Sequence, residues 1–156
     1  MKKSFLIIAV VISVILMSGC DVFGSNKTMT CTKDSTDEDG FKVTDTMKIT
    51  YNSDKVLKVN NTNISETDPE YLDMQLAFGS SFAESFNEIS GIDVSYTKTD
   101  DGKLKMEMNV DFEKIDIDEI KNTLGELYSE DDSFYSKESY TIDEFKNENL
   151  EGYSCK

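Results

Sequence analysis

Two stretches of the chain alternate apolar and polar residues. In residues 104–112 the apolar positions are every second residue: Leu104, Met106, Met108, Val110 and Phe112. Residues 41–51 alternate in the same way, with Asp45 as the one interruption on the apolar side. Successive side chains of a strand point to opposite faces, so this pattern predicts strands that are buried on one side only.

Each of these strands has a predicted partner. A turn at residues 52–55 leads into a strand over 56–64, and the Asp-Gly turn at 100–102 follows a strand over 92–96. A short strand at residues 29–33 and an extended segment at 150–155 complete the set, and helices are expected at 69–90, 117–127 and 142–149. This order predicts an α+β domain: an antiparallel sheet built from two hairpins plus terminal strands, with helices packed on one face.

The longest predicted helix carries a row of aromatic residues. Asp68 suits the N-cap and Pro69 the first helical position. Apolar residues, with one glutamine, then recur at spacings of three and four: Tyr71, Gln75, Phe78, Phe82, Phe86 and Ile89. Such a row predicts a wide face packed in the core. The alternative that it lines a ligand cleft stays open.

The amino terminus has the pattern of an export signal. Basic residues at the start, an apolar run over residues 5–17 and the small pair Ser18-Gly19 are typical of a secretory signal peptide. The apolar run is too short for a transmembrane helix, which needs about 20 residues.

Cys20 directly follows this segment, and residues 16–20 resemble a bacterial lipobox. The resemblance implies cleavage after Gly19 and a diacylglyceryl thioether on Cys20, whose two acyl chains would anchor the protein stably. We therefore expect a signal peptide over 1–19, a lipidated tether over 20–27 and a single domain over 28–156. The protein would sit in the cell membrane by its lipid and face the extracytoplasmic side. The alternatives are an uncleaved anchor and a plain secreted protein.

The chain is strongly acidic. It has 31 acidic and 16 basic residues and a net charge of −15. Such a surface repels phosphate backbones, so we expect no nucleic-acid partner. The acidity serves solubility, or it attracts cations or cationic peptides.

The chain lacks histidine and arginine, which excludes several catalytic mechanisms. Without histidine the chain has no Ser-His or Cys-His nucleophile system, and without arginine it has no guanidinium clamp. We expect no enzyme and no cofactor, although carboxylate, Ser-Lys and Tyr chemistry remain available. The acidic turns at 34–40 and 130–132 fit a solvated turn or a weak calcium site, and no metal site is assigned to them.

The remaining candidate residues lie in the exported part. Cys31 and Cys155 stand near the two ends of the domain, and we expect a disulfide between them, with two buried thiols as the alternative. A late acidic loop carries aromatic residues that are candidate interface anchors or fold back on the sheet: Tyr128, Phe134, Tyr135 and Tyr140.

The chain resembles the YehR-like family of small bacterial lipoproteins. The resemblance lies in the lipobox at Cys20, the early strand at 29–32, the hairpin at 47–59, the long helix from Tyr71 and the ending at 150–156. It implies the fold and the location but no biochemical role. We expect a membrane-anchored, non-enzymatic binding or interaction module whose protein or small-molecule partner is unknown. The alternative is a small-ligand or cation-binding lipoprotein that serves a transporter.

Overall fold

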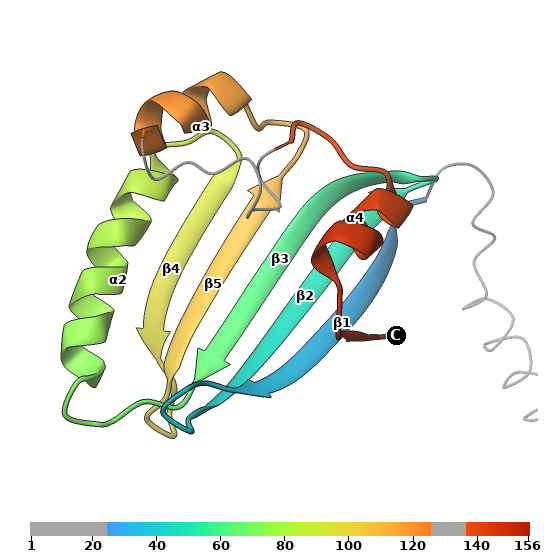
Figure 1. Cartoon of the computed structure of the whole chain (residues 1–156). Coiled ribbons are helices and arrows are strands. Elements are labelled where there is room, and N and C mark those ends of the chain that lie inside the picture. Colours follow the sequence, from blue (N-terminus) through green and yellow to red (C-terminus); the bar gives the residue numbers. More distant parts are fainter. Residues whose placement is uncertain (1–24, 126–136) are drawn as a thin grey trace, which may run out of the picture.

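The computed structural model describes residues 25–125 and 137–156. Within these residues six strands form one antiparallel sheet of order β4-β5-β3-β2-β1-β6 (Figure 1). The strands are β1 (Lys27–Thr36), β2 (Lys42–Asn52), β3 (Lys55–Ser65), β4 (Ile92–Lys98), β5 (Leu104–Asp111) and β6 (Ser154–Cys155). The helices are α2 (Leu72–Asn87), α3 (Ile117–Leu124) and α4 (Ile142–Asn149). The predicted α+β class and antiparallel sheet are confirmed.

The register of the strands explains the alternation in the sequence. Met47 of β2 lies opposite Asn61 of β3, which lies opposite Met108 of β5, and all three are buried. The adjacent row passes through Thr46, Thr62 and Glu107. Because neighbouring positions on a strand point to opposite faces, one face of the sheet carries the core and the other carries threonine, asparagine and charged side chains.

The core draws on every helix. Its buried cluster runs from Cys31 to Leu150 and includes Ala83 and Phe86 of α2, Ile120 of α3 and Phe145 of α4.

Helix α2 turns a different side to the core from the one predicted. Its buried residues are Leu72, Gly79, Ala83 and Phe86; of the predicted row Phe86 and Ile89 are buried, whereas Tyr71, Phe78 and Phe82 are exposed. Gly79 is the physical reason. A Cβ atom at this position would lie 2.5 Å from a ring carbon of Tyr96, so only glycine lets the helix approach β4 this closely. The small residues Gly79 and Ala83 therefore lie on the buried side of the helix, and the side chains of Tyr71, Phe78 and Phe82 are exposed to solvent.

A side chain of α2 also fastens the helix to the edge of the sheet. The Asn87 amide donates to the carbonyl of Val94 at 3.0 Å, and its oxygen accepts from the Val94 N–H at 2.6 Å. β4 is the outer strand of the sheet. Asn87 therefore satisfies backbone groups that would otherwise offer an edge for pairing.

The helix ends follow the sequence signals in part. Helix α4 begins with a capping box, in which Thr141 and Glu144 exchange hydrogen bonds. Asp116 caps α3 by accepting from the N–H groups of Asp118 and Glu119, and the Glu119 carboxylate accepts from the Ser90 N–H. Asp68 holds a turn by accepting from the Glu70 N–H, and α2 begins only at Leu72.

In the part of the chain that the structure describes, each helix is too short or too polar to cross a membrane.

Candidate interaction surface

Large apolar side chains are exposed along the first three turns of α2. We call Tyr71, Met74, Phe78 and Phe82 the α2 aromatic surface; their exposed fractions are 51%, 63%, 76% and 37%. Single exposed apolar residues are ordinary, but a contiguous group marks a binding surface on a soluble domain. The Phe82 ring packs against the Phe86 ring, with the two ring centroids 4.7 Å apart.

The aromatic surface borders a hollow in the protein. This aromatic hollow has a volume of about 370 Å³ and lies between α2 and the neighbouring ends of β4 and β5. It is lined by Gln75, Phe78, Gly79, Phe82, Tyr96 and Leu104. Gly79 brings the helix close to Tyr96, so the same residue that orients α2 also shapes the wall of the hollow.

A second hollow continues from the first toward the start of α2. This acidic hollow has a volume of about 540 Å³ and shares Gln75 and Leu104 with the aromatic hollow. Its other lining residues are Asp37, Asp39, Phe41, Ser65, Glu66, Thr67, Asp68 and Tyr71. The two hollows adjoin at Gln75 and Leu104, and we call them together the α2 groove.

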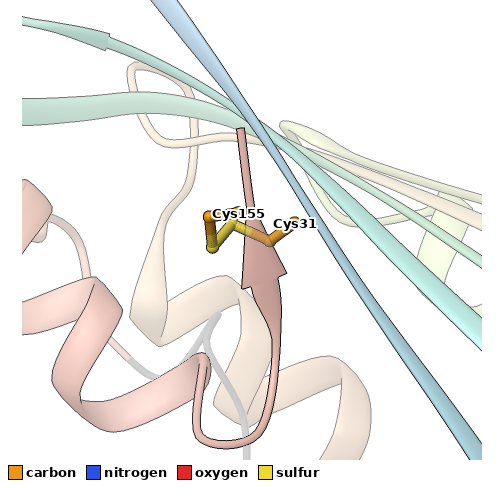
Figure 2. Close-up of a disulfide and its surroundings, with 2 residues drawn as sticks. All are labelled: Cys31 and Cys155. Atoms are coloured by element: carbon orange, nitrogen blue, oxygen red, sulfur yellow. A yellow bond between two sulfur atoms is a disulfide. The ribbon is translucent and has the colours of Figure 1, made fainter.

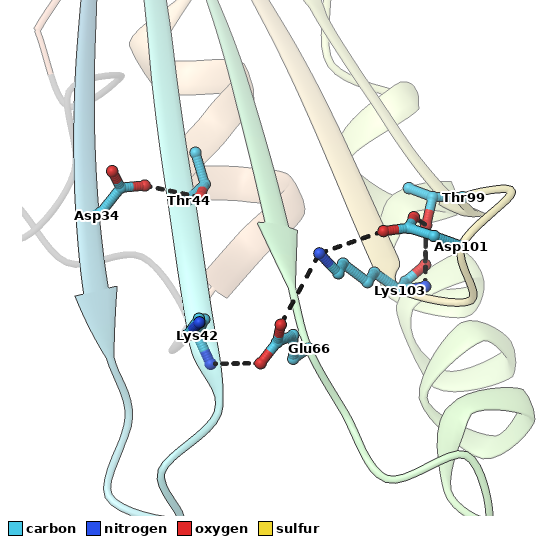
Figure 3. Close-up of polar contacts among 7 residues, drawn as sticks. All are labelled: Asp34, Lys42, Thr44, Glu66, Thr99, Asp101 and Lys103. Carbon is cyan, nitrogen blue, oxygen red and sulfur yellow. Dashed lines mark hydrogen bonds and ion pairs between the residues drawn. The ribbon is translucent and has the colours of Figure 1, made fainter.

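The carboxylates of the acidic hollow are held by local structure. Asp37 accepts from the N–H groups of Asp39 and Phe41, at 3.1 and 2.8 Å, and so shapes the β1–β2 turn. Glu66 accepts from the Lys42 N–H at 3.3 Å and lies 3.8 Å from the Lys103 ammonium (Figure 3).

The Lys103 ammonium forms ion pairs with two carboxylates. Its ammonium lies 3.2 Å from Asp101 as well as near Glu66 (Figure 3). The hydrogen bond from the Thr99 hydroxyl, together with Lys103, holds the pKa of Asp101 below its ordinary value. The lysine therefore neutralises Glu66 only in part, and the hollow keeps a negative balance.

All the charged side chains of residues 59–97, the stretch that contains α2, are acidic. Residues 59–97 contain seven acidic residues and neither lysine nor arginine. This stretch includes the end of β3, all of α2 and most of β4. The α2 groove therefore lies in a negative field, with apolar surface at its centre.

A third hollow, of about 680 Å³, lies on the polar face of the sheet. Three lysines and two aspartates line it, and two of the lysines share one carboxylate: the Lys58 ammonium lies 2.9 Å and the Lys114 ammonium 3.6 Å from Asp111. Partial burial opposes ionisation of Asp111, but the hydrogen bonds from Lys58 and the Glu113 N–H, together with the charges of Lys58 and Lys114, outweigh it and keep the pKa of Asp111 below its ordinary value. No aromatic side chain lines this hollow, so it is the weaker binding candidate.

Cys31 and Cys155 lie opposite each other on β1 and β6 (Figure 2). Their sulfur atoms are 2.06 Å apart, which is the length of a disulfide bond, as the sequence predicted. The bridge joins positions 124 residues apart and fastens the last strand to the sheet.

A polar network beside the disulfide was not predicted. Asp45 accepts from the Asn61 amide at 2.7 Å and from the Tyr153 hydroxyl at 2.5 Å. Asn61 is buried, so these bonds satisfy a polar group inside the protein. The signal in the sequence was Asp45 itself, the one acidic residue at an apolar position of its strand.

The structure changes the list of predicted interface residues. Cys20, Tyr128, Phe134 and Tyr135 lie outside the described residues. Tyr140 is 3% exposed, so its prediction as an interface residue is wrong. Its ring packs edge-on against Phe112 and Phe145, with centroid distances of 5.7 and 5.4 Å, because it fills the core between β5 and α4.

The first acidic turn is partly strand. Asp34 belongs to β1 and accepts from the Thr44 hydroxyl of β2 at 2.7 Å (Figure 3). The second turn, at 130–132, lies outside the described residues. Among the described residues, histidine, cysteine and carboxylate side chains form no cluster able to hold a metal ion.

Two solved structures share this arrangement. The NMR structure of a protein from Streptococcus pneumoniae TIGR4 matches with a TM-score of 0.58 and 12% identity, over 86% of this chain and 87% of that chain. The NMR structure of Escherichia coli YehR matches with a TM-score of 0.56 and 18% identity, over 86% of this chain and 93% of that chain. The chain has a YehR-like fold. At these identities the likeness concerns the fold alone. No protein-family model and no curated protein matches the sequence.

Proposed function

We propose that the protein is a membrane-anchored surface lipoprotein that acts as a non-enzymatic binding module, with the α2 aromatic surface as its binding face. The observation that carries the proposal is the exposure of Phe78 and Met74, 76% and 63%, beside a hollow lined by further apolar side chains. Exposed apolar area costs free energy in water, about 25 cal/mol per Å². A partner that covers this surface recovers that free energy, and aromatic residues are the usual anchors of such interfaces.

The proposal treats the domain as two hairpins with terminal strands and with helices on one face of the sheet. In that arrangement α2 stands at one end of the helical layer, along β4, while α4 contacts β3. Its outer side is then left for a partner.

The proposed anchor and the binding face lie at opposite ends of the first strand. β1 starts at Lys27, the last residue of the proposed tether over 20–27, and ends at Thr36, next to the turn that lines the acidic hollow (Figure 1). Ten strand residues span about 33 Å. A lipid on Cys20 would therefore hold the start of β1 at the membrane and direct the α2 groove outward.

A ligand-binding lipoprotein that serves a transporter is the second candidate. The observation that favours it is that the two hollows adjoin at Gln75 and Leu104, which places carboxylate and aromatic side chains next to each other. The shallow shape and the exposed aromatic row favour a macromolecular partner instead, because small-molecule sites enclose most of their ligand.

Photo-cross-linking in producing cells tests the binding face. A benzophenone amino acid placed at position 78 should give a discrete adduct, and the same probe at Glu107, on the polar face of the sheet, should not. Substituting Met74→Ser in the position-78 protein should weaken the adduct. Equal labelling from both positions, or none from position 78, would reject the α2 aromatic surface as the binding face.

Fractionation tests the anchor separately. The Cys20→Ala protein should leave the membrane fraction or stay unprocessed, and it should take up no acyl label. Continued acylation of this variant would remove the lipoprotein part of the proposal.

A further inference from the structure

We infer that the α2 groove binds a cationic amphipathic segment of a partner protein, with apolar side chains in the aromatic hollow and lysine or arginine in the acidic hollow. The inference rests on the proposed function, since it takes the α2 aromatic surface as the binding face. It adds the chemistry of the partner.

The apolar half of the partner follows from the aromatic hollow. Phe78 and Phe82 form one wall, and Tyr96 and Leu104 belong to the strands opposite. An aliphatic or aromatic side chain seated here contacts carbon on both sides. Phe78 is itself exposed enough to be covered by the rest of the segment.

The cationic half follows from the adjoining hollow. Four carboxylates line it: Asp37, Asp39, Glu66 and Asp68. The Lys103 ammonium, which lies near Glu66, also forms an ion pair with Asp101. Residues 59–97, which include α2, carry seven acidic residues and no lysine or arginine, and the Lys103 ammonium, 3.8 Å from Glu66, offsets only part of the negative charge. Complementary charge steers a partner to such a site and excludes partners of the same sign.

The same charge argues against a second copy of the chain as the occupant. Each copy has a net charge of −15, and self-association through α2 would bring two acidic surfaces together. Like charges across an interface are unfavourable. A basic segment removes this repulsion and covers the aromatic residues as well.

The groove also sets a spacing for the partner. Tyr71 lines the acidic hollow and Phe78 the aromatic one. Seven residues of helix separate them, or about 10 Å along the axis. A matching segment carries its basic and apolar groups about two helical turns apart, or about three residues apart when extended.

Peptide binding tests the inference. The probe is a fluorescent, synthetic amphipathic helix of leucine and lysine, with a counterpart in which glutamate replaces every lysine. The protein is the processed chain, residues 20–156, carrying Cys20→Ser, and binding is followed by anisotropy at low and high salt. We expect the lysine peptide to bind at least about tenfold more tightly than the glutamate peptide and to weaken as salt rises.

Matched variants assign the binding to the two hollows. Phe78→Ser and Met74→Ser should each weaken it about tenfold or more, as expected for interface anchors. The pair Asp39→Asn and Asp68→Asn should weaken it several-fold and reduce its salt dependence, whereas Asp93→Asn, on the polar face of the sheet, should leave it unchanged. Circular dichroism confirms that each variant is folded.

The outcomes separate the inference from the proposed function. If both peptides bind equally and only Phe78→Ser and Met74→Ser matter, the binding face stands and the cationic partner is rejected. If the aspartate pair matters and the two α2 variants do not, the binding face itself is wrong. If vesicles of phosphatidylcholine or phosphatidylglycerol compete for the same residues, the occupant is a lipid surface, and the inference is overturned.

Discussion

Gly79 decides which side of α2 faces the sheet. Its missing side chain leaves room for the Tyr96 ring, and a Cβ atom there would lie 2.5 Å from that ring. A single small residue thus turns the aromatic residues of the helix toward solvent.

Gly79→Ala should therefore destabilise the fold. By helix propensity alone this change would stabilise the protein by about 1 kcal/mol. Because the new methyl group collides with Tyr96, we expect a net loss of about 1–3 kcal/mol, the usual effect of overpacking. Urea denaturation measures it, with Ser80→Ala on the exposed side as the control. A Gly79→Ala protein as stable as the parent would show that the close approach is not required.

Tyr153 links the carboxyl-terminal segment to the middle of the sheet. Burial and the hydrogen bond to Asp45 raise the pKa of Tyr153 above its ordinary value. The folded state therefore favours the neutral phenol. This contribution to stability is complete below the pKa of an unfolded tyrosine, about 10, and is lost as the pH rises above it.

Tyr153→Phe tests this link in two ways. At neutral pH we expect a loss of about 1 kcal/mol, the net worth of an ordinary hydrogen bond. Above about pH 10 the parent protein should lose stability more steeply than the variant, whereas below that pH the two slopes should be the same. Parallel stability curves for the two proteins would contradict the assignment.

At the scale of elements, Asn87 joins α2 to the outer strand of the sheet. Its amide pairs with both backbone groups of Val94. The helix therefore covers part of the edge that β4 would otherwise present to other chains.

Asn87→Ala should lower stability by about 1–3 kcal/mol because it leaves the Val94 groups without their partner. Amide exchange of the Val94 N–H should also become faster, a local effect that a general loss of stability would not single out. Ser85→Ala, at an exposed position of the same helix, is the control. An unchanged exchange rate of the Val94 N–H would show that the Asn87 side chain does not protect it.

The elements differ in how far the sequence predicts them. Residues 104–112 alternate strictly and residues 41–51 do so apart from Asp45, so their strands and buried faces were predictable. The orientation of α2 was not, because the aromatic row and the set Leu72, Gly79, Ala83 and Phe86 are both regular helical faces. The shape of Tyr96 on β4 selects between them, and that contact is not local in sequence. The hydrogen bond between Asp45 and Tyr153 joins residues 108 positions apart, so it could not be predicted from the local sequence either.

The candidate site was predicted least well. The sequence placed the interface in the late aromatic loop, yet Tyr140 of that loop packs in the core. The α2 aromatic surface was taken for core, since a row of aromatic residues at helical spacing is usually buried. A hint was present: a helix with Phe78 and Phe82 on one side and Gly79 and Ala83 beside them has more apolar surface than one sheet contact can cover.

At the scale of the whole molecule, the disulfide closes the chain on itself. It joins β1 to β6 across 124 residues of sequence. A cross-link over so long a loop restricts the unfolded chain strongly, which is worth about 4–5 kcal/mol in the chain-entropy model.

The double variant Cys31→Ala and Cys155→Ala should therefore unfold at a clearly lower urea concentration than the parent, by about 4 kcal/mol. Reductant should weaken the parent protein and leave the double variant unchanged. The control is Cys20→Ser, which removes a cysteine outside the bridge. A double variant within about 1 kcal/mol of the parent would show that the bridge adds little to stability.

The central claim is that the molecule binds its partner through the α2 groove. The most direct measurement is an NMR titration of the isotope-labelled chain, residues 20–156 with Cys20→Ser, using the leucine–lysine peptide. The account predicts that the largest amide shifts fall on residues 65–82, Tyr96 and Leu104. Shifts centred instead on the polar face, at Lys48, Asn60 and Asn109, or no shifts at saturating peptide, would contradict it.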